Sequence, residues 1–96
     1  MRDSEFEWDD AKAVRNWRDH GVSFEEAREA FDDPHGVERV DRRHDDREER
    51  LALIGMARQS MLFVSFTLRG QRVRINSARK VEPHERRRYH NENRAP

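Results

Sequence analysis

The chain has 96 residues, no cysteine and a formal net charge of zero; 42% of its residues are charged and 33% are hydrophobic. These values fit a single small domain over residues 1–96. The regular spacing of apolar residues along the chain argues against disorder. The lack of cysteine excludes disulfide and thiol chemistry. Because no apolar run approaches the roughly 18 residues of a membrane span and no signal-peptide core is present, we expect a cytoplasmic protein without membrane contacts.

Charge is divided unevenly between the two halves of the chain. Residues 1–49 hold 17 acidic and nine basic residues, a net −8, whereas residues 50–96 hold three acidic and 11 basic residues, a net +8. Such a split is typical of a basic half that binds a polyanion or an acidic partner. The alternative is that the two halves neutralise each other across the fold.

A first helix is predicted from about Asp10 to His20. Residues 6–8, Phe-Glu-Trp, precede it, either as an edge strand or as the start of a hydrophobic staple. Asp9 or Asp10 can cap the helix, and Gly21 is a natural C-terminal stop. The apolar residues of this helix fall on one stripe: Ala13, Val14 and Trp17.

A second helix is predicted from about Phe24 to Asp32. Ser23 and Glu26 have the spacing of a capping box, and the Asp33-Pro34 pair ends the helix, since a residue before proline avoids helical ψ. Its apolar residues follow at helical spacing: Phe24, Ala27, Ala30 and Phe31.

Four strands in a meander are predicted next. Residues 37–42 form a weak first strand and residues 50–57 a second, separated by a charge run at 41–49 that we expect to be a solvated turn. Residues 61–80 form a hairpin with a tight turn at Arg69-Gly70, where glycine supplies a positive φ.

That turn predicts a hairpin with one apolar and one cationic side. Phe66 would then lie opposite Val73, and a one-residue slip would mix the two sides. The same register pairs Val64 with Ile75, Ser65 with Arg74, and Thr67 with Arg72. We expect one buried sheet face covered by residues of the two helices, made of Leu62, Val64, Phe66, Val73 and Ile75 under Val14, Trp17, Phe24 and Phe31.

The chain ends in a third predicted helix. Proline at an early position in Val81-Glu82-Pro83 suits a helix start, and Glu85 and Tyr89 share one face with Val81. Residues 91–96 are expected to be frayed. The predicted fold class is therefore α+β: two N-terminal helices, a four-stranded antiparallel sheet and a C-terminal helix.

The chain resembles the BrnT family of bacterial type II toxins, which share the RelE-like ribonuclease fold, in two blocks of residues. The first block comprises residues 6–9 (Phe-Glu-Trp-Asp), Lys12, Asn16, residues 20–27 (His-Gly-Val-Ser-Phe-Glu-Glu-Ala), Phe31, Asp33 and Pro34. The second comprises Arg50, Ile54, Gly55, Val64, Arg69, Arg74, Ile75, residues 77–80 (Ser-Ala-Arg-Lys), Glu85 and Tyr89. The chain departs from the family pattern at Asp19, where a basic residue is usual, and at Asn76, where an aliphatic residue is usual.

The resemblance implies a ribonuclease toxin that inhibits translation and growth by metal-independent RNA cleavage. It also implies a BrnA-like antitoxin with a ribbon-helix-helix part, held with the toxin in a heteromeric complex that binds DNA only through the antitoxin. We expect the antitoxin to cover Phe63, Arg72, Arg74 and the last helix around Tyr89. No cofactor is expected.

Metal-free RNA cleavage needs a base for the ribose 2′-OH, cations for the phosphorane and an acid for the leaving oxygen. Arginine suits the second task because its planar fork binds phosphate oxygens and stays charged. We expect Arg69, Arg74 and Arg79 to converge near one sheet edge as a phosphate clamp, with Arg69 and Arg79 catalytic. Substrate-binding residues are predicted at Arg72, Arg74 and Lys80, with ordinary solvent-face residues as the alternative for Arg72 and Arg74, favoured in the case of Arg72.

The remaining candidates are Lys12, His20, Glu85 and Tyr89. The resemblance implies a catalytic contribution from Lys12, with a surface lysine lying over Trp8 as the alternative. His20 can act as acid or base, or bond terminal carbonyls of its own helix. Glu85 and Tyr89, one turn apart, can face one site, or Tyr89 can pack on the sheet. The other histidines lack metal-ligand spacing, so no metal is predicted: His35, His44, His84 and His90.

A second class of function stays open from the residues alone. A non-catalytic module that binds RNA, or only a partner protein, would suit the zero net charge and the lack of a clear acid–base pair. A DNA-binding regulator is disfavoured, since the short helices lack a cationic recognition face.

Overall fold

The computed structural model describes residues 1–42 and 49–94. Most of the predicted solvated turn at 41–49 lies outside these residues. The described elements are β1 (Phe6–Glu7), α1 (Asp10–His20), α2 (Phe24–Ala30), β2 (Val37–Val40), β3 (Leu51–Ala57), β4 (Ser60–Arg69), β5 (Arg72–Lys80) and α3 (Pro83–Glu92). Among the described helices, none is long and apolar enough to cross a membrane.

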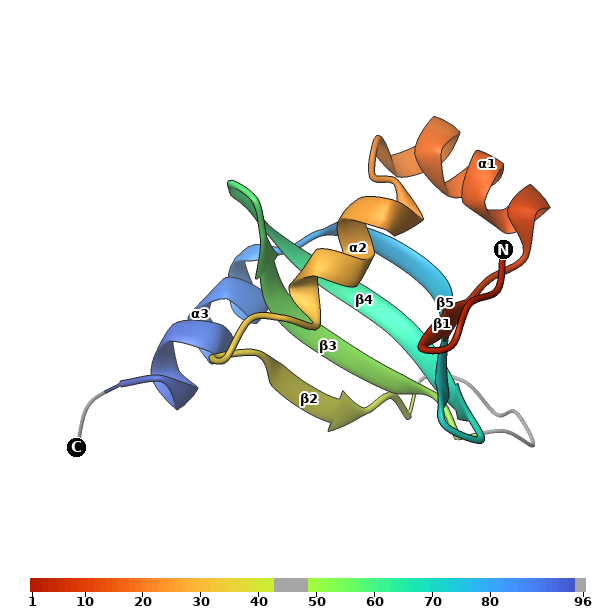
Figure 1. The fold of residues 1–96 in the computed structure, drawn as a ribbon. Coiled ribbons are helices and arrows are strands. Elements are labelled where there is room, and N and C mark those ends of the chain that lie inside the picture. Colours follow the sequence, from red (N-terminus) through yellow and green to blue (C-terminus); the bar gives the residue numbers. More distant parts are fainter. Residues whose placement is uncertain (43–48, 95–96) are drawn as a thin grey trace.

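These elements form a mixed sheet with helices on both faces. The strand order is β1-β5-β4-β3-β2, with α1 and α2 on one face and α3 on the other (Figure 1). The predicted α+β class and the order of helices and strands are confirmed. The sheet has five strands rather than four, because β1 pairs in parallel with β5 through Phe6–Val73 and Glu7–Arg74.

The helix ends follow the expected capping chemistry. Asp9 accepts bonds from the N–H groups of Ala11 and Lys12 at 2.8 and 3.3 Å, and Gly21 ends α1 in the left-handed conformation at φ +66°. Ser23 Oγ accepts from Glu26 N–H at 3.0 Å. In α3, proline occupies the first turn, and Glu82 and Glu85 form a capping box.

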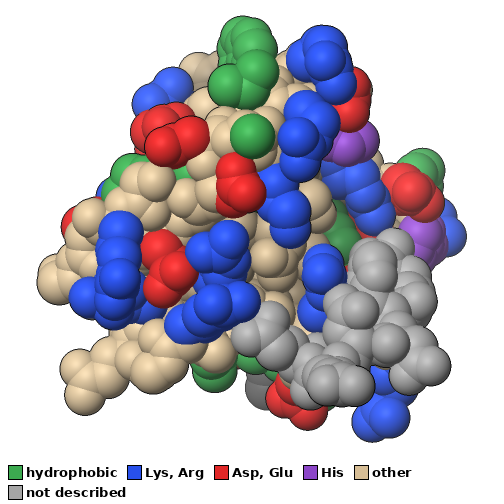
Figure 2. All heavy atoms as spheres, turned by 90° about the vertical axis from the view of Figure 1, so that its right-hand side faces the viewer, with side chains coloured by type: hydrophobic (Ala, Val, Ile, Leu, Met, Phe, Trp, Pro, Cys, Tyr) green, Lys and Arg blue, Asp and Glu red, His purple; other side chains and the backbone are tan. Residues whose placement is uncertain are grey.

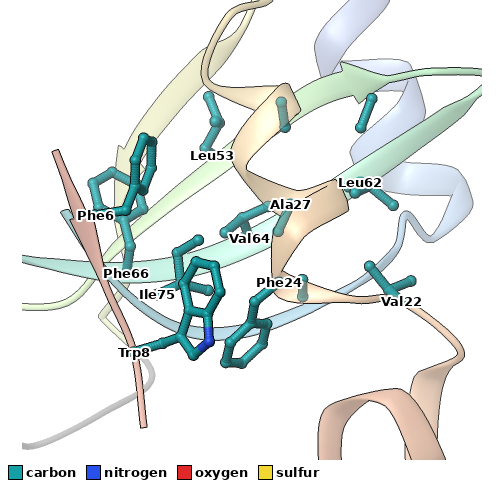
Figure 3. Packing of buried hydrophobic residues seen from close by; sticks show 13 residues of the cluster. Phe6, Trp8, Val22, Phe24, Ala27, Leu53, Leu62, Val64, Phe66 and Ile75 are labelled. Carbon is teal, nitrogen blue, oxygen red and sulfur yellow. The ribbon is translucent and has the colours of Figure 1, made fainter. Parts of the chain in front are cut away.

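The main core lies between the sheet and α2, and the amino-terminal segment closes one side of it (Figure 3). Phe31 bridges Phe6 and Phe66 through edge-to-face contacts, with ring centroids 5.3 and 5.0 Å apart. A Cβ on Gly55 would lie 2.7 Å from the Ala30 carbonyl oxygen, so the absence of a side chain there lets α2 approach β3. The predicted sheet residues are buried, except that Val73 is partly buried: Leu62, Val64, Phe66 and Ile75.

The predicted hairpin register is wrong by two residues. The turn is Gly70-Gln71, with Gly70 at φ +60°, so Arg69 pairs with Arg72 and Phe66 pairs with Ile75 instead of Val73. A shift of two keeps every side chain on its expected face, which is why the alternating pattern could not detect it. Thr67 accordingly lies opposite Arg74.

A β-bulge changes the pairing again farther along the hairpin. The register shifts between Ser65 and Phe66, so that Ser65 pairs with Ser77 and Asn76 is the extra residue. Val64 therefore lies opposite Ala78, not Ile75. Both Ile75 and Ala78 reach the core, although three positions separate them.

The predicted apolar stripe of α1 does not face the core. Val14 and Trp17 are 67% and 60% exposed, whereas Asn16 is buried. The reason is the position of α1, which lies against β5, beyond the two residues of β5 that pair with β1. There the helix meets backbone polar groups, and an amide side chain satisfies them better than an indole.

Candidate functional site

The residues predicted as functional are distributed over three places. One is the junction between α1 and β5, which holds Lys12 and His20. Another is the end of β5 under α3, which holds Arg79 and Glu85. The last is the hairpin turn at Arg69.

A pocket of 260 Å³ lies between α1 and β5, just beyond the part of β5 that β1 covers. It is lined by Lys12, Arg15, Asn16, Asp19, His20, Asn76 and Ser77. Figure 2, which looks at the side of the molecule that carries α1 and β1, shows Lys and Arg side chains gathered there and interrupted by single acidic ones.

Asn16 fixes the floor of this pocket. Its side-chain NH2 donates to the carbonyl oxygens of Val22 at 2.9 Å and Ala78 at 2.8 Å, and its oxygen accepts from the Ala78 N–H at 3.0 Å. The two bonds to Ala78 tie α1 to β5 beside the bulge, and the bond to Val22 ties α1 to the segment that leads into α2. Next to them, Asn76 Nδ2 is buried and has no hydrogen-bond partner among the described residues, so an unsatisfied donor lies at the pocket.

The pocket carries more positive than negative charge. Within the described part of the chain Lys12 and Arg15 form no ion pair, whereas Asp19 pairs with Arg18 at 3.3 Å. His20 makes no hydrogen bond to a described residue, so it does not bond the terminal carbonyl groups of α1, the alternative role considered for it. The Trp17 carbonyl oxygen accepts instead from the Gly21 N–H, at 2.8 Å.

Arg79 lies two residues after Ser77 on the same face of β5, a distance of about 7 Å along the strand. Its guanidinium donates two bonds to Glu85, both at 2.8 Å, and stacks over the Phe63 ring at 4.4 Å from the centroid. Burial raises the pKa of Glu85, but bonds from Arg79 and from Glu82 N–H, with the charge of Arg79, outweigh burial and bring this pKa below its usual value. Glu85 thus stays ionised and holds the Arg79 fork in one orientation.

The expected convergence of Arg69, Arg74 and Arg79 is wrong. Arg69 and Arg79 lie at opposite ends of the β4–β5 ladder, about 20 Å apart at the backbone. Arg74 pairs with Glu7 at 2.8 Å, and Arg72 Nε donates to the Asp3 carbonyl oxygen at 2.7 Å. These two arginines therefore secure the amino-terminal segment.

Lys80 is exposed at the end of β5, opposite Leu62.

Glu85 and Tyr89 share the sheet-facing side of α3 but do not share a site. The Tyr89 hydroxyl donates to Asp33 Oδ2 at 2.7 Å. Burial, followed by this bond and the Asp33 charge, raises the pKa of Tyr89 to about 12. Tyr89 is therefore a packing residue, as the alternative interpretation of the sequence had it.

A second cavity, of 230 Å³, lies under α3 on the other sheet face, where Phe63, His84, Glu85 and Arg88 meet β2 and β3. Throughout residues 1–42 and 49–94 no three His, Cys, Asp or Glu side chains come close enough to hold a metal ion together.

Sequence reasoning missed three residues of this architecture: Asn16, Arg15 and Asp33. Asn16 and Asp33 appear in the sequence analysis only among the residues of the family resemblance or as a helix stop. The apolar pattern of α1 does not point to Asn16, because this residue bonds backbone groups of Val22 and Ala78 and buries no apolar area. Nothing in the sequence singles out Arg15 from the other exposed arginines.

The sequence of the chain matches the model of a known protein family. No curated protein matches the chain. A family model described as "Ribonuclease toxin, BrnT, of type II toxin-antitoxin system" matches residues 8–85, which include α1, the whole sheet except its first residues, and the start of α3. The chain therefore belongs to the BrnT family of ribonuclease toxins of type II toxin–antitoxin systems.

Proposed function

We propose that this ribonuclease toxin cleaves RNA without a metal ion at the junction between α1 and β5. The observation that supports this proposal is the shared pocket: Lys12 and His20 line it together with Ser77, whose neighbour on the same strand face is Arg79. A phosphate lying against Ser77 would have Lys12 on one side and Arg79 on the other.

The chemistry is a transesterification within the RNA chain. The ribose 2′-oxygen attacks the adjacent phosphorus and loses its proton to a base, and the bond from phosphorus to the 5′-oxygen breaks as that oxygen takes up a proton. The products carry a 2′,3′-cyclic phosphate and a 5′-hydroxyl. In our proposal His20 takes the proton from the 2′-hydroxyl and then gives a proton to the leaving 5′-oxygen. Lys12 and Arg79 stabilise the negative charge that develops on the phosphorane.

Other residues have supporting roles in this proposal. Glu85 is a positioning residue, since it orients Arg79 without contacting substrate. Asn76 Nδ2 supplies a buried donor for a phosphate oxygen or a ribose hydroxyl. Lys80, next to Arg79 at the end of β5, contacts a phosphate that flanks the cleaved one. Arg69 lies at the far end of the hairpin and has no role at the cleaved phosphate, while Arg72 and Arg74 are assigned to the fold.

The test is a cleavage assay on a short RNA in the presence of EDTA, with product ends identified by mass spectrometry. Cyclic phosphate ends are expected, together with full protection by a single 2′-deoxy nucleotide at the cleaved position. Lys12→Gln should lower the rate by about 10²–10³, the usual loss for a group that stabilises transition-state charge. Arg87→Gln, on the exposed side of α3, is the matched control and should cleave at the wild-type rate.

Arg79 needs a different design. Arg79→Ala alone leaves Glu85 buried without its partner and threatens the fold, contrary to the simple expectation that such a variant stays folded. The double variant Arg79→Ala with Glu85→Gln avoids the unpaired charge. A folded double variant with undiminished cleavage, or cleavage stopped by EDTA, would refute the proposal.

A ribonuclease toxin of a type II system acts on RNA and has an antitoxin partner. We infer further that the antitoxin is BrnA-like, with a ribbon-helix-helix part that dimerises and supplies DNA binding, and that the complex forms in the cytoplasm. Size-exclusion chromatography of the toxin with the small protein encoded beside it tests this inference. A toxin that elutes alone and ignores that protein would contradict it.

A further inference from the structure

The outer side of α1 carries two large apolar side chains that the fold leaves exposed. Large hydrophobic residues with high exposure occur at four described positions: Val14, Trp17, Val40 and Leu68. Single exposed residues of this kind are ordinary. Val14 and Trp17 differ because they are three residues apart on one helix, so their side chains adjoin and form one patch.

The fold does not need this patch. Three hydrogen bonds of Asn16 attach α1 to the rest of the fold. The helix itself is capped by Asp9 at its start and by Gly21 at its end. Trp17 lies 60% exposed above this attachment. Tryptophan is a mediocre helix former on a surface and a frequent anchor in protein interfaces, so its presence here favours a binding role.

Positive charge adjoins the patch on one side. Arg18 follows Val14 by one helical turn, and Arg15 lies beside Val14 and Arg18 on the helix surface. Arg15 also lines the pocket between α1 and β5, so the patch continues into the proposed catalytic site. Figure 2 shows hydrophobic side chains at the top of this face with Lys and Arg side chains beside them.

We propose that the outer side of α1, formed by Val14, Trp17, Arg15 and Arg18, is the docking surface for the antitoxin. The segment that fits it is amphipathic and acidic: apolar side chains cover Val14 and Trp17, and carboxylates meet Arg15 and Arg18. This inference rests on the partner proposed above and names the surface that this partner binds.

The position of the surface provides inhibition without a conformational change. Lys12 and Arg15 are one turn apart on the same helix and line the same pocket. A segment anchored on Trp17 and paired with Arg15 therefore reaches the pocket mouth and competes with RNA phosphate for the same cations. The face expected earlier is less suitable, because Tyr89 is buried and Arg72 and Arg74 bind the amino-terminal segment.

The test measures the affinity of the purified toxin for the ribbon-helix-helix protein encoded beside it. Trp17→Ala should weaken binding at least about 30-fold, the threshold of a hot-spot residue, and Val14→Ala by a smaller factor. Arg18→Glu should slow association and reduce its salt dependence. Leu68→Ala is the matched control, because Leu68 is 61% exposed at the far end of the hairpin, and it should bind like the wild type.

Each outcome separates this inference from the proposal on which it rests. Wild-type binding with unaffected Trp17→Ala and Val14→Ala variants would overturn the docking surface and leave the antitoxin proposal intact. Absence of wild-type binding would overturn both. If Trp17→Ala impairs RNA cleavage but not complex formation, the patch contacts RNA, and the docking proposal is wrong. A second copy of the toxin on the patch would appear as a dimer that Trp17→Ala dissociates, and would also refute it.

Discussion

The carboxylate of Asp33 joins three parts of the fold through separate hydrogen bonds. It accepts from the N–H groups of Met56 and His35, both at 2.8 Å, and from the Tyr89 hydroxyl at 2.7 Å. Burial raises the pKa of Asp33, but these bonds outweigh burial and lower it below the usual value. The sequence predicts that the helix ends at about Asp32, before Asp33-Pro34, and α2 ends two residues earlier, at Ala30. It gives no sign of Tyr89 as a partner, because nothing local links residues 56 positions apart.

This pair predicts a pH dependence at both ends of the scale. A carboxyl with a depressed folded pKa stabilises the fold above its unfolded pKa of about 3.9, and this stability is lost as pH falls through the lower folded value. A phenol with a raised pKa stabilises it below an unfolded value of about 10, and this stability is lost as pH rises through about 12.

We therefore expect Tyr89→Phe to lower the free energy of unfolding at pH 7 by about 1.5–3 kcal/mol, the range for a hydrogen bond to a charged group. The variant should also show a weaker loss of stability between about pH 10 and pH 12 than the wild type. Urea denaturation across pH measures both effects. An unchanged alkaline limb would show that the Tyr89 hydroxyl is not the group whose raised pKa shapes stability at high pH.

The central hairpin shows where pattern analysis stops. Alternation of apolar and polar residues correctly assigned both faces of β4 and the first half of β5. It could not place the turn, because a shift of two residues preserves alternation. It also could not predict the bulge at Asn76, since one extra residue in a strand follows from the pairing of both strands. The bulge places Ser77 and Arg79, which are two residues apart and share a face, on the side of β5 opposite the core residue Ile75, so this part of the site depends on it.

Helix α1 was predicted with the right boundaries and the wrong inner face. Its three apolar residues suggested burial of Val14 and Trp17, whereas the edge of β5 selects Asn16. Hydrophobicity alone cannot reveal this, because the contact satisfies backbone groups instead of burying apolar area.

Two substitutions on α1 distinguish these interpretations. Asn16→Ala leaves the Ala78 N–H and two carbonyl oxygens without their partner, so we expect a loss of at least about 2 kcal/mol in the free energy of unfolding. Trp17→Ala, one residue away on the exposed side, should change it by less than about 0.5 kcal/mol. Urea denaturation compares the two, and a larger loss for Trp17→Ala would restore the apolar stripe as the inner face.

The uneven charge along the chain is partly neutralised across the folded molecule. Two ion pairs join an acid of the first half to an arginine of the second: Glu7 with Arg74 at 2.8 Å and Glu29 with Arg58 at 2.9 Å. A third pair has the opposite sense, with Arg39 from the first half and Glu92 from the second. The neutralising alternative thus holds for part of the surface. It does not remove the charge at the pocket, where Lys12 and Arg15 form no ion pair with any described residue.

Overall architecture was easier to predict than the site. Caps, turns and apolar spacing are local signals, and they gave the class, the order of elements and most of the core. The site depends on contacts between residues far apart in the chain, such as Asn16 with Ala78 and Arg79 with Phe63, which local signals do not contain. The family match supplied the activity, while the arrangement of cations around one pocket came only from the fold.

The distribution of cations predicts the salt dependence of RNA binding. Each phosphate contact to a single strand contributes about −0.7 to the slope of log affinity against log salt concentration. If RNA lies over the pocket, the double variant Lys12→Gln, Arg15→Gln should make this slope less negative by about 1.4, because two contacts are lost. The double variant Arg86→Gln, Arg87→Gln removes the same charge from the exposed side of α3 and should leave the slope nearly unchanged. Fluorescence anisotropy with a 2′-O-methyl oligonucleotide, which binds without being cleaved, measures the slopes at several salt concentrations. A large change for the α3 pair and none for the α1 pair would place the RNA on the far side of the sheet, and the α1–β5 pocket would lose its assignment as the catalytic site.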